Sequence, residues 1–301
     1  MTLVVIAGPT GSGKSELALR LAIVCGGEIV NYDSMQIYRG FNVGTAKPSE
    51  ADREAVPHHL FDIVEANEEF NAADYARRAR EVCEDIVSRG RKPILVGGTF
   101  FYLRALLAGL PAMPGRDEHI RARLRQIATT PRGSERLHRW LTRIDRESAS
   151  RIPPPDRHRV ERALEVWITS GRPISSWERP GRETGNELPS VKIGLRLDRD
   201  KLAERLDARI ERMYRSGLVE ETRALLTRFA PTARPFGSIG YREAAAVVAG
   251  EIDLASAIAE TKRRTRAYAK RQMTWLRSER NVHWVDAKER EETLAAALRL
   301  L

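Results

Sequence analysis

Residues 3–15 read Leu-Val-Val-Ile-Ala-Gly-Pro-Thr-Gly-Ser-Gly-Lys-Ser, and this stretch decides the fold of the chain. An apolar, β-branched run ends in a segment that matches G-x-x-x-x-G-K-[ST], the phosphate-binding loop. A helix-like pattern follows from Glu16 to Val24, so the motif has the strand and the helix that it requires. Backbone N–H groups of such a loop surround an anion. The sequence therefore predicts a bound diphosphate or triphosphate, with a chance glycine-rich turn as the alternative.

The predicted diphosphate site consists of the whole loop. Its residues are Gly8, Pro9, Thr10, Gly11, Ser12, Gly13, Lys14 and Ser15. The ammonium group of Lys14 adds a mobile positive charge, and the hydroxyl group of Ser15 is placed to ligate Mg²⁺, the one cofactor that we expect. The six histidines and two cysteines show no metal-ligand spacing, so we expect no zinc site.

The net charge of +10 is unevenly distributed along the 301 residues. Residues 116–182 hold 16 Lys and Arg against 9 Asp and Glu, and residues 262–280 hold 8 against 1. Two basic segments beside a phosphate loop favour a polyanion larger than a nucleotide, although solvated arginine-rich helix faces are the alternative. The sequence shows no leader peptide and no apolar run long enough to span a bilayer. We expect a cytoplasmic protein with no membrane contact.

Further strands are predicted at residues 28–33, 93–96 and 191–197, whereas residues 39–70 are expected to be irregular. The composition changes at residues 109–115, after which arginine-rich helical patterns replace strand patterns. We therefore predict an α/β protein with a P-loop NTPase-like core, in which helices flank a parallel sheet. Residues 1–115 and 190–301 would form this core, and residues 116–189 would form an inserted, small, all-helical domain.

Two polar residues follow predicted strands. Asp33 follows the second strand and Thr99 follows the run Ile94 to Val96, so both are expected near the phosphate loop at the carboxyl edge of the sheet. Hydrolytic P-loop proteins usually carry a Mg²⁺-binding Asp at the end of such a run, but here the run ends in glycines and a threonine. Asp33 is better suited to removing a proton. The alternatives are that Asp33 and Gln36 form a capping box and that Thr99 caps a helix.

Several separate motifs, in their order and spacing, resemble the tRNA dimethylallyltransferase family. They are the phosphate loop, Asp33-Ser34-Met35-Gln36-Ile37-Tyr38, Gly44-Thr45-Ala46-Lys47-Pro48, Pro57-His58-His59-Leu60, Gly97-Gly98-Thr99, Arg159 to Val166, Gly240-Tyr241-Arg242 and Lys270 to Arg277. The resemblance covers nearly the whole chain and fits the bacterial form, which lacks the zinc finger of eukaryotic members. Residues 158–162 depart from the common Gln-Arg-Leu-Ser-Arg-like pattern.

The resemblance implies transfer of a dimethylallyl group from dimethylallyl diphosphate to N6 of the adenine just 3′ of the anticodon. In that reaction Asp33 would be the general base, Lys14 would stabilise the leaving diphosphate, and Thr99 would bond near the reacting centre. The partner would be the anticodon stem-loop of tRNA, bound by a monomer. The residues expected to bind tRNA are Asp33, Ser34, Met35, Gln36, Thr99, Arg121, His158, Arg159, Val160, Glu161, Arg162, Gly240, Tyr241, Arg242, Lys270, Arg271 and Gln272.

Three other functions remain open on the sequence. An adenylate isopentenyltransferase would perform the same chemistry on free AMP, but it would not need the basic segments. A small-molecule kinase shares the phosphate loop and the α/β core, and would consume ATP. A non-catalytic RNA-binding protein with a nucleotide switch would have no use for Asp33.

Overall fold

The computed structural model describes residues 2–177, 187–287 and 289–301. The chain divides into two compact units, a core unit of Met1–Leu107 with Leu188–Leu301 and a helical unit of Ala108–Glu187. The chain leaves and re-enters the core unit at neighbouring points, because the Leu188 N–H donates to the Leu107 carbonyl at 2.9 Å. Residues 178–186, which belong to the predicted insert, lie outside the described residues.

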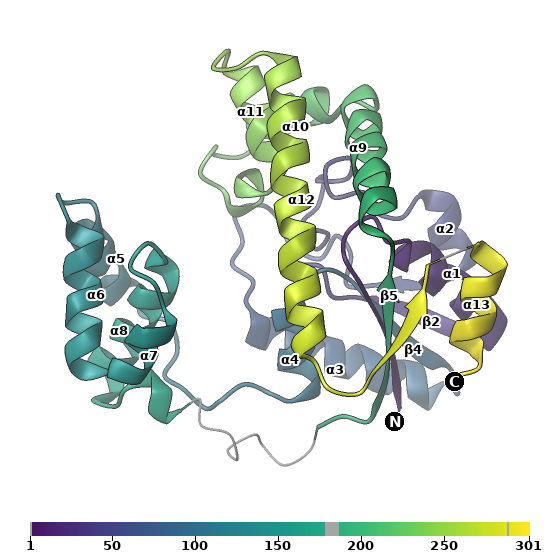
Figure 1. Cartoon of the computed structure of the whole chain (residues 1–301), viewed down its shortest axis with the longest axis horizontal. Coiled ribbons are helices and arrows are strands. Elements are labelled where there is room, and N and C mark those ends of the chain that lie inside the picture. Colours follow the sequence, from purple (N-terminus) through teal and green to yellow (C-terminus); the bar gives the residue numbers. More distant parts are fainter. Residues whose placement is uncertain (1, 178–186, 288) are drawn as a thin grey trace. The chain divides into compact units, whose positions relative to one another are not determined.

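The core unit contains a six-stranded sheet in the order β3-β2-β4-β1-β5-β6 (Figure 1). Its strands are β1 (Leu3–Ala7), β2 (Gly27–Asn31), β3 (His58–His59), β4 (Lys92–Val96), β5 (Ser190–Arg196) and β6 (Val282–Asp286). Every pairing is parallel, so the carboxyl ends of all strands lie at one edge. This parallel sheet confirms the predicted fold class.

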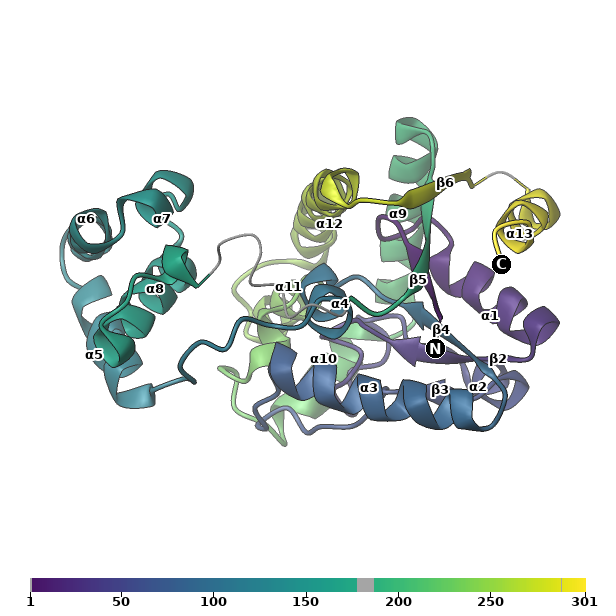
Figure 2. The ribbon, with the colours of Figure 1, turned by 90° about the horizontal axis from the view of Figure 1, so that it is seen from below.

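Helices cover both faces of the sheet, with α1 and α13 on one face and α3 and α4 on the other (Figure 2). The helices of the core unit are α1 (Lys14–Cys25), α2 (Glu50–Ala55), α3 (Ala72–Ser88), α4 (Phe100–Leu107), α9 (Arg199–Arg215), α10 (Leu218–Leu226), α11 (Tyr241–Val248), α12 (Leu254–Ser278) and α13 (Arg290–Leu298). The long helix α12 packs against α9 and α11. At the carboxyl end of β5 the chain leads almost directly into α9.

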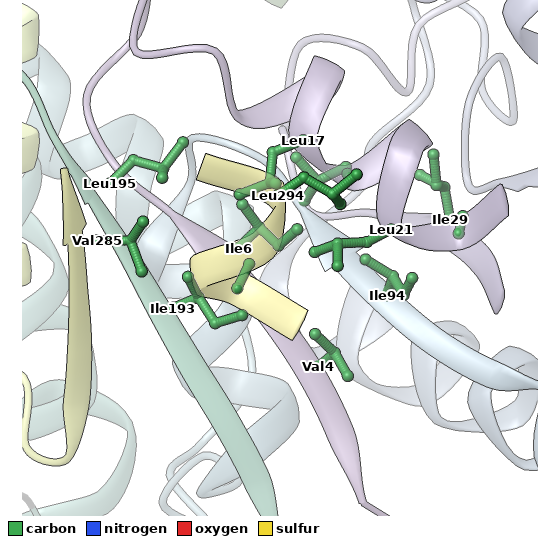
Figure 3. Packing of buried hydrophobic residues seen from close by; sticks show 14 of the residues in the cluster. Val4, Ile6, Leu17, Leu21, Ile29, Ile94, Ile193, Leu195, Val285 and Leu294 are labelled. Atoms are coloured by element: carbon green, nitrogen blue, oxygen red, sulfur yellow. The ribbon is translucent and has the colours of Figure 1, made fainter. Parts of the chain in front are cut away.

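Apolar side chains from the strands and from α1 and α13 pack together between sheet and helices (Figure 3). Ile6 and Ile193 are fully buried there, and Leu21 of α1 is fully buried as well. Burying one such side chain contributes about 1.5–3 kcal/mol. Because strands covered on both faces need no polar side, this packing explains the continuous apolar runs in the sequence.

The prediction that residues 39–70 are irregular is wrong in two places. The short helix α2 begins after Ser49, whose side chain and Asp52 form a capping box. The two-residue strand β3 pairs with Ile29 and Val30 at the edge of the sheet. Neither element is long enough to show a periodic pattern of apolar residues in the sequence. Strand β3 depends on its pairing with β2, and helix α2 depends on its N-terminal cap.

The helical unit consists of α5 (Glu118–Ala128), α6 (Gly133–Ile144), α7 (Arg146–Arg151) and α8 (Arg157–Ser170). It has its own apolar core, which includes Leu124, Leu141 and Leu164. Within the described ranges of this unit there is no strand, in agreement with the absence of strand patterns in its sequence. No helix in the described part of the chain has the length and apolar character needed to cross a membrane.

Candidate active site

The phosphate loop joins β1 to α1 and depends on glycine. Gly11 and Gly13 adopt φ angles of 80° and 93°, a region that other residues rarely adopt. A Cβ atom on Gly11 would lie 2.8 Å from the side chain of Leu206 in α9. The loop is therefore covered closely by α9, a helix that lies almost two hundred residues later in the sequence.

Two cations, Lys14 and Arg209, face the space beside this loop. The ammonium group of Lys14 donates to the Pro9 carbonyl at 2.8 Å. Burial, followed by the positive charge of Arg209, lowers the pKa of Lys14 to about 7, although the Asp33 carboxylate acts in the opposite direction. Burial also lowers the pKa of Arg209. Among the described residues neither cation forms an ion pair with a carboxylate, so an anionic ligand would supply the missing charge.

Arg209 is not among the site residues predicted from the sequence. Leu206 and Ile210 on the same helix are buried, so the apolar pattern of this helix indicates core packing. The available signal was an arginine between two buried apolar positions, where a cation needs a partner. That signal could not identify the partner, because the approach of α9 to the phosphate loop depends on tertiary packing.

Asp33 and Thr99 lie in a network of short polar contacts at the carboxyl ends of β2 and β4. One carboxylate oxygen of Asp33 accepts from the Met35 N–H at 2.9 Å. The hydroxyl group of Thr99 accepts from the Ser34 N–H at 2.9 Å and donates to the Ser34 hydroxyl group at 3.0 Å. Turn residues follow Asp33, so the alternative that it caps a helix is wrong.

Helix α12 connects the phosphate loop to the end of β4. The Gln272 side chain accepts from the Thr10 N–H at 2.7 Å and donates to the Gly98 carbonyl at 3.1 Å. The Tyr268 hydroxyl group donates to the same carbonyl at 3.0 Å. A Cβ atom on Gly98 would lie 2.9 Å from a carboxylate oxygen of Asp33, so a larger residue there would displace that side chain. Tyr268 was not among the predicted site residues.

Two adjoining cavities meet at Asp33. The inner cavity, of about 340 Å³, is lined by residues that include Lys14, Ser15, Asp33 and Arg209. The outer cavity, of about 370 Å³, shares Asp33 and Arg209 with it and extends to Arg271. Volumes above about 300 Å³ are typical of small-molecule sites. The arrangement can hold an anion beside Lys14 and a second molecule beside Asp33.

A third hollow, of about 500 Å³, lies against the phosphate loop from Gly11 to Ser15. Its lining is strongly basic and includes Arg20, Arg205, Arg209, Arg212 and Arg290. Loop N–H groups at the start of α1 and several guanidinium groups give this side of the loop a positive potential. The surroundings of the loop thus favour a multiply charged anion.

Several residues expected to bind tRNA belong to the helical unit. Arg121 and Arg162 of the helical unit bond to the buried Glu165, and Arg159 pairs with Asp156. Four others differ in exposure: His158 and Arg242 are exposed, whereas Val160 and Glu161 are buried.

Tyr241 and its neighbour Gly240 are buried, while Lys270 and Arg271 on α12 are exposed. The structure contains no RNA. The role of all these residues in tRNA binding therefore stays a prediction.

Comparison with known proteins identifies the family. Residues 36–279 match the family model described as IPP transferase. The tRNA dimethylallyltransferase of Solibacter usitatus is 50% identical over 95% of this chain and 92% of its own, and that of Geobacter sulfurreducens is 46% identical over 94% and 91%. The crystal structure of the tRNA isopentenylpyrophosphate transferase from Bacillus halodurans matches with a TM-score of 0.72 and 36% identity, covering 98% of this chain and 93% of that one.

A eukaryotic dimethylallyltransferase acting on tRNA matches with a TM-score of 0.80 and 28% identity, and the match covers 99% of this chain and 77% of that one. Both structural matches extend over nearly the whole chain, and the tRNA isopentenyltransferases have the P-loop NTPase-like fold. The family model covers most of the chain, and the relatives align with it nearly from end to end. The chain belongs to the IPP transferase family, the family of the tRNA dimethylallyltransferases.

Proposed function

We propose that this protein transfers a dimethylallyl group from dimethylallyl diphosphate to N6 of the adenine 3′-adjacent to the anticodon of tRNA, and releases diphosphate. The observation that carries the proposal is the inner cavity, which has the cations Lys14 and Arg209 near the phosphate loop and the carboxylate of Asp33 at its junction with the outer cavity. A donor with a charged half and an apolar half fits such a site.

The departure of the diphosphate is the step that needs the most stabilisation. The allylic C–O bond breaks and diphosphate departs with the electron pair, so negative charge grows on oxygens held by the phosphate loop. Lys14 and Arg209 stabilise that charge, and they do so most strongly in a site from which water is excluded. Both side chains line the inner cavity beside the loop.

Magnesium fits this site as a companion of the diphosphate. The described ranges contain no group of three His, Cys, Asp or Glu side chains suited to a metal ion. The Ser15 hydroxyl group borders both the inner cavity and the basic hollow, and Mg²⁺ is usually held by one or two protein oxygens together with substrate phosphates. When bound, it would supply further positive charge at the diphosphate.

Asp33 would complete the reaction on the acceptor side. The exocyclic amine of adenine forms the new C–N bond to the allylic carbon and gives up a proton, which the Asp33 carboxylate accepts. The Met35 N–H and the Thr99–Ser34 contacts fix the turn that carries this carboxylate. The adenine must leave its stack to reach Asp33, so we expect base flipping into the outer cavity.

The basic segments favour tRNA over a free nucleotide. Lys270 and Arg271 are exposed on α12, and Arg271 lines the outer cavity. Phosphate contacts from such side chains would position an anticodon stem-loop beside the cavity. We further propose that the protein works as a monomer in the cytoplasm, since the sequence carries no apolar heptad that would need a partner.

Incubation with radiolabelled dimethylallyl diphosphate tests the proposal directly. We expect label in tRNA, and none in AMP at the same concentration. Label in AMP alone would indicate an adenylate isopentenyltransferase, and ATP consumption without label in RNA would indicate a kinase. An Asp33→Asn variant should bind tRNA normally and lose most of its turnover. Retained turnover in this variant would disprove the general-base role.

A further inference from the structure

The wall of both cavities includes a loop without helix or strand, residues 40–48, here called the wall loop. Thr45 lines the inner and the outer cavity, and Gly44 lines the outer one. The wall loop also approaches the turn that carries Asp33. Because it has no regular secondary structure, its shape depends on contacts that other elements supply.

Two residues from outside the site provide those contacts. The carboxylate of Glu221 on α10 accepts from the N–H groups of Asn42 and Val43, at 3.2 Å and 3.0 Å. The hydroxyl group of Tyr241 on α11 accepts from the Gly44 N–H at 3.1 Å and donates to the Glu221 carboxylate. Three consecutive backbone donors of the wall loop are thus bound by one pair of side chains. Neither side chain lines the inner or the outer cavity.

The fit between this pair and the wall loop is close. Tyr241 is fully buried, and a Cβ atom on Gly44 would lie only 2.4 Å from its ring. The ring of Phe41 meets the Tyr241 ring edge-on, with 4.9 Å between centroids. Burial and the neighbouring Glu221 carboxylate raise the pKa of Tyr241, so its hydroxyl group stays protonated and keeps donating.

On its other side the wall loop holds the turn that carries Asp33. The side-chain amide of Gln36 donates to the carbonyls of Thr45 and Ala46, at 3.1 Å and 3.2 Å. Gln36 follows Asp33 by three residues in the same turn. A continuous series of hydrogen bonds therefore runs from α10 and α11, through the wall loop, to the turn of Asp33.

We propose that Glu221 and Tyr241 are positioning residues for the transfer reaction: they hold the wall loop, and through Gln36 they align Asp33 with the acceptor amine. The inference rests on the proposed function and assigns a role inside the protein to Tyr241, for which the family resemblance suggested tRNA contact. A displacement of reacting groups by about 1 Å can cost up to a hundredfold in rate. A small displacement of Glu221 or Tyr241 is therefore expected to lower the rate of the transfer reaction.

The test removes one oxygen atom, with the substitution Tyr241→Phe. We expect kcat with tRNA to fall about tenfold, while the dissociation constant for tRNA stays within about twofold. Amide hydrogen exchange at residues 42–44 should become faster, because their acceptors are weakened. The matched control is Tyr75→Phe, since Tyr75 is equally buried and its hydroxyl group has no hydrogen-bond partner among the described residues. This control should leave kcat and exchange at residues 42–44 unchanged.

If Tyr241→Phe folds poorly, Glu221→Gln tests the same proposal. This substitution preserves the size of the side chain but removes the charge that binds the wall loop, and it should lower kcat in the same way. Loss of tRNA affinity with unchanged kcat would overturn the proposal in favour of direct tRNA contact. A lower melting temperature with unchanged kcat would reduce the pair to a stabilising role. If the wild-type protein modifies no tRNA, the proposed function fails, whereas the exchange rates still report on the wall loop.

Discussion

Two clusters of cations in this molecule have opposite surroundings. In the helical unit, Arg121 and Arg162 bond to Glu165 at 2.8 Å and 2.6 Å, and this carboxylate is completely buried. It also accepts from the Asp117 N–H at 2.7 Å. In the core unit, Lys14 and Arg209 lie beside the phosphate loop, and the described residues place no carboxylate within ion-pair distance of either. One cluster shares a buried carboxylate of the protein, and the other has no carboxylate at ion-pair distance.

The difference separates cations that build the fold from cations for which we propose an anionic ligand. A buried charge without a partner costs free energy, and a protein retains it where a bound anion recovers that cost. Arg121 and Arg162 already have their anion, and Arg162 also donates to the carbonyl of Pro114 at 2.7 Å. They attach the start of the helical unit to α8. The count of basic residues in a segment therefore does not measure the charge available to RNA.

The strongest test of this comparison is the substitution Arg209→Met. We expect kcat/KM for dimethylallyl diphosphate to fall by about 100- to 1,000-fold, because a charge aimed at the leaving group is removed. The melting temperature should change little, since Arg209 forms no ion pair with a carboxylate among the described residues. Steady-state kinetics and thermal unfolding measure the two effects. Arg215→Met, an exposed position on the same helix, is the control. A clear loss of stability with normal kinetics would assign Arg209 to the fold.

The opposite result is expected for Glu165→Gln. Breaking the cluster leaves Arg121 and Arg162 without their anion and should destabilise the helical unit by roughly 3 kcal/mol, near the lower limit for buried pairs because both guanidinium groups are partly exposed. Hydrogen exchange in α5 and α8 measures the effect. Glu118→Gln, which removes an exposed partner of Arg116, should change little. Normal exchange in the Glu165 variant would contradict a structural role for this cluster.

Local signals in the sequence were enough for most of the fold. The phosphate loop, between its strand and helix, predicted the parallel sheet, and the sites of Asp33 and Thr99 followed from the ends of their strands. Asn71 caps α3, and the spacing of Asn71 and Asp74 is that of a capping box. These features depend on residues close together in the chain, and the shared carboxyl edge of a parallel sheet then brings them together.

The remaining features depend on contacts between distant segments. Arg209 reaches the phosphate loop only because α9 packs over Gly11, and Tyr241 is buried because the wall loop folds over it. The pairing of Arg162 with Glu165 had a visible signal, an arginine and a glutamate three residues apart on one helix. This spacing is common on helix surfaces, but here Glu165 is buried and the pair has a structural role. The spacing alone does not indicate that burial.

The pH dependence of donor binding provides a smaller test. With the pKa of Lys14 at about 7 in the free protein, the ammonium form is complete near pH 6 and is lost as the pH rises. Affinity for dimethylallyl diphosphate should therefore fall about tenfold between pH 6 and pH 8. A Lys14→Arg variant stays charged over this range. The affinity of this variant for the donor should therefore not show the tenfold fall that Lys14 causes. Titration of the donor's own phosphate changes the affinity of the wild-type protein and of the variant equally. Equal slopes for the two proteins would show that Lys14 is charged throughout.

The smallest expected effect belongs to Arg159, which lies on α8 one turn before Arg162. Its side chain is 65% exposed and, within the described ranges, pairs with Asp156 alone, so Arg159→Gln should leave the melting temperature unchanged. If Arg159 contacts a tRNA phosphate, the slope of log affinity against log salt should decrease by about 1. Arg162→Gln should instead destabilise the helical unit, and any change in its tRNA binding should follow from that loss. An unchanged salt slope for Arg159→Gln would show that Arg159 makes no contact with a tRNA phosphate, because each such contact contributes to the salt dependence of binding.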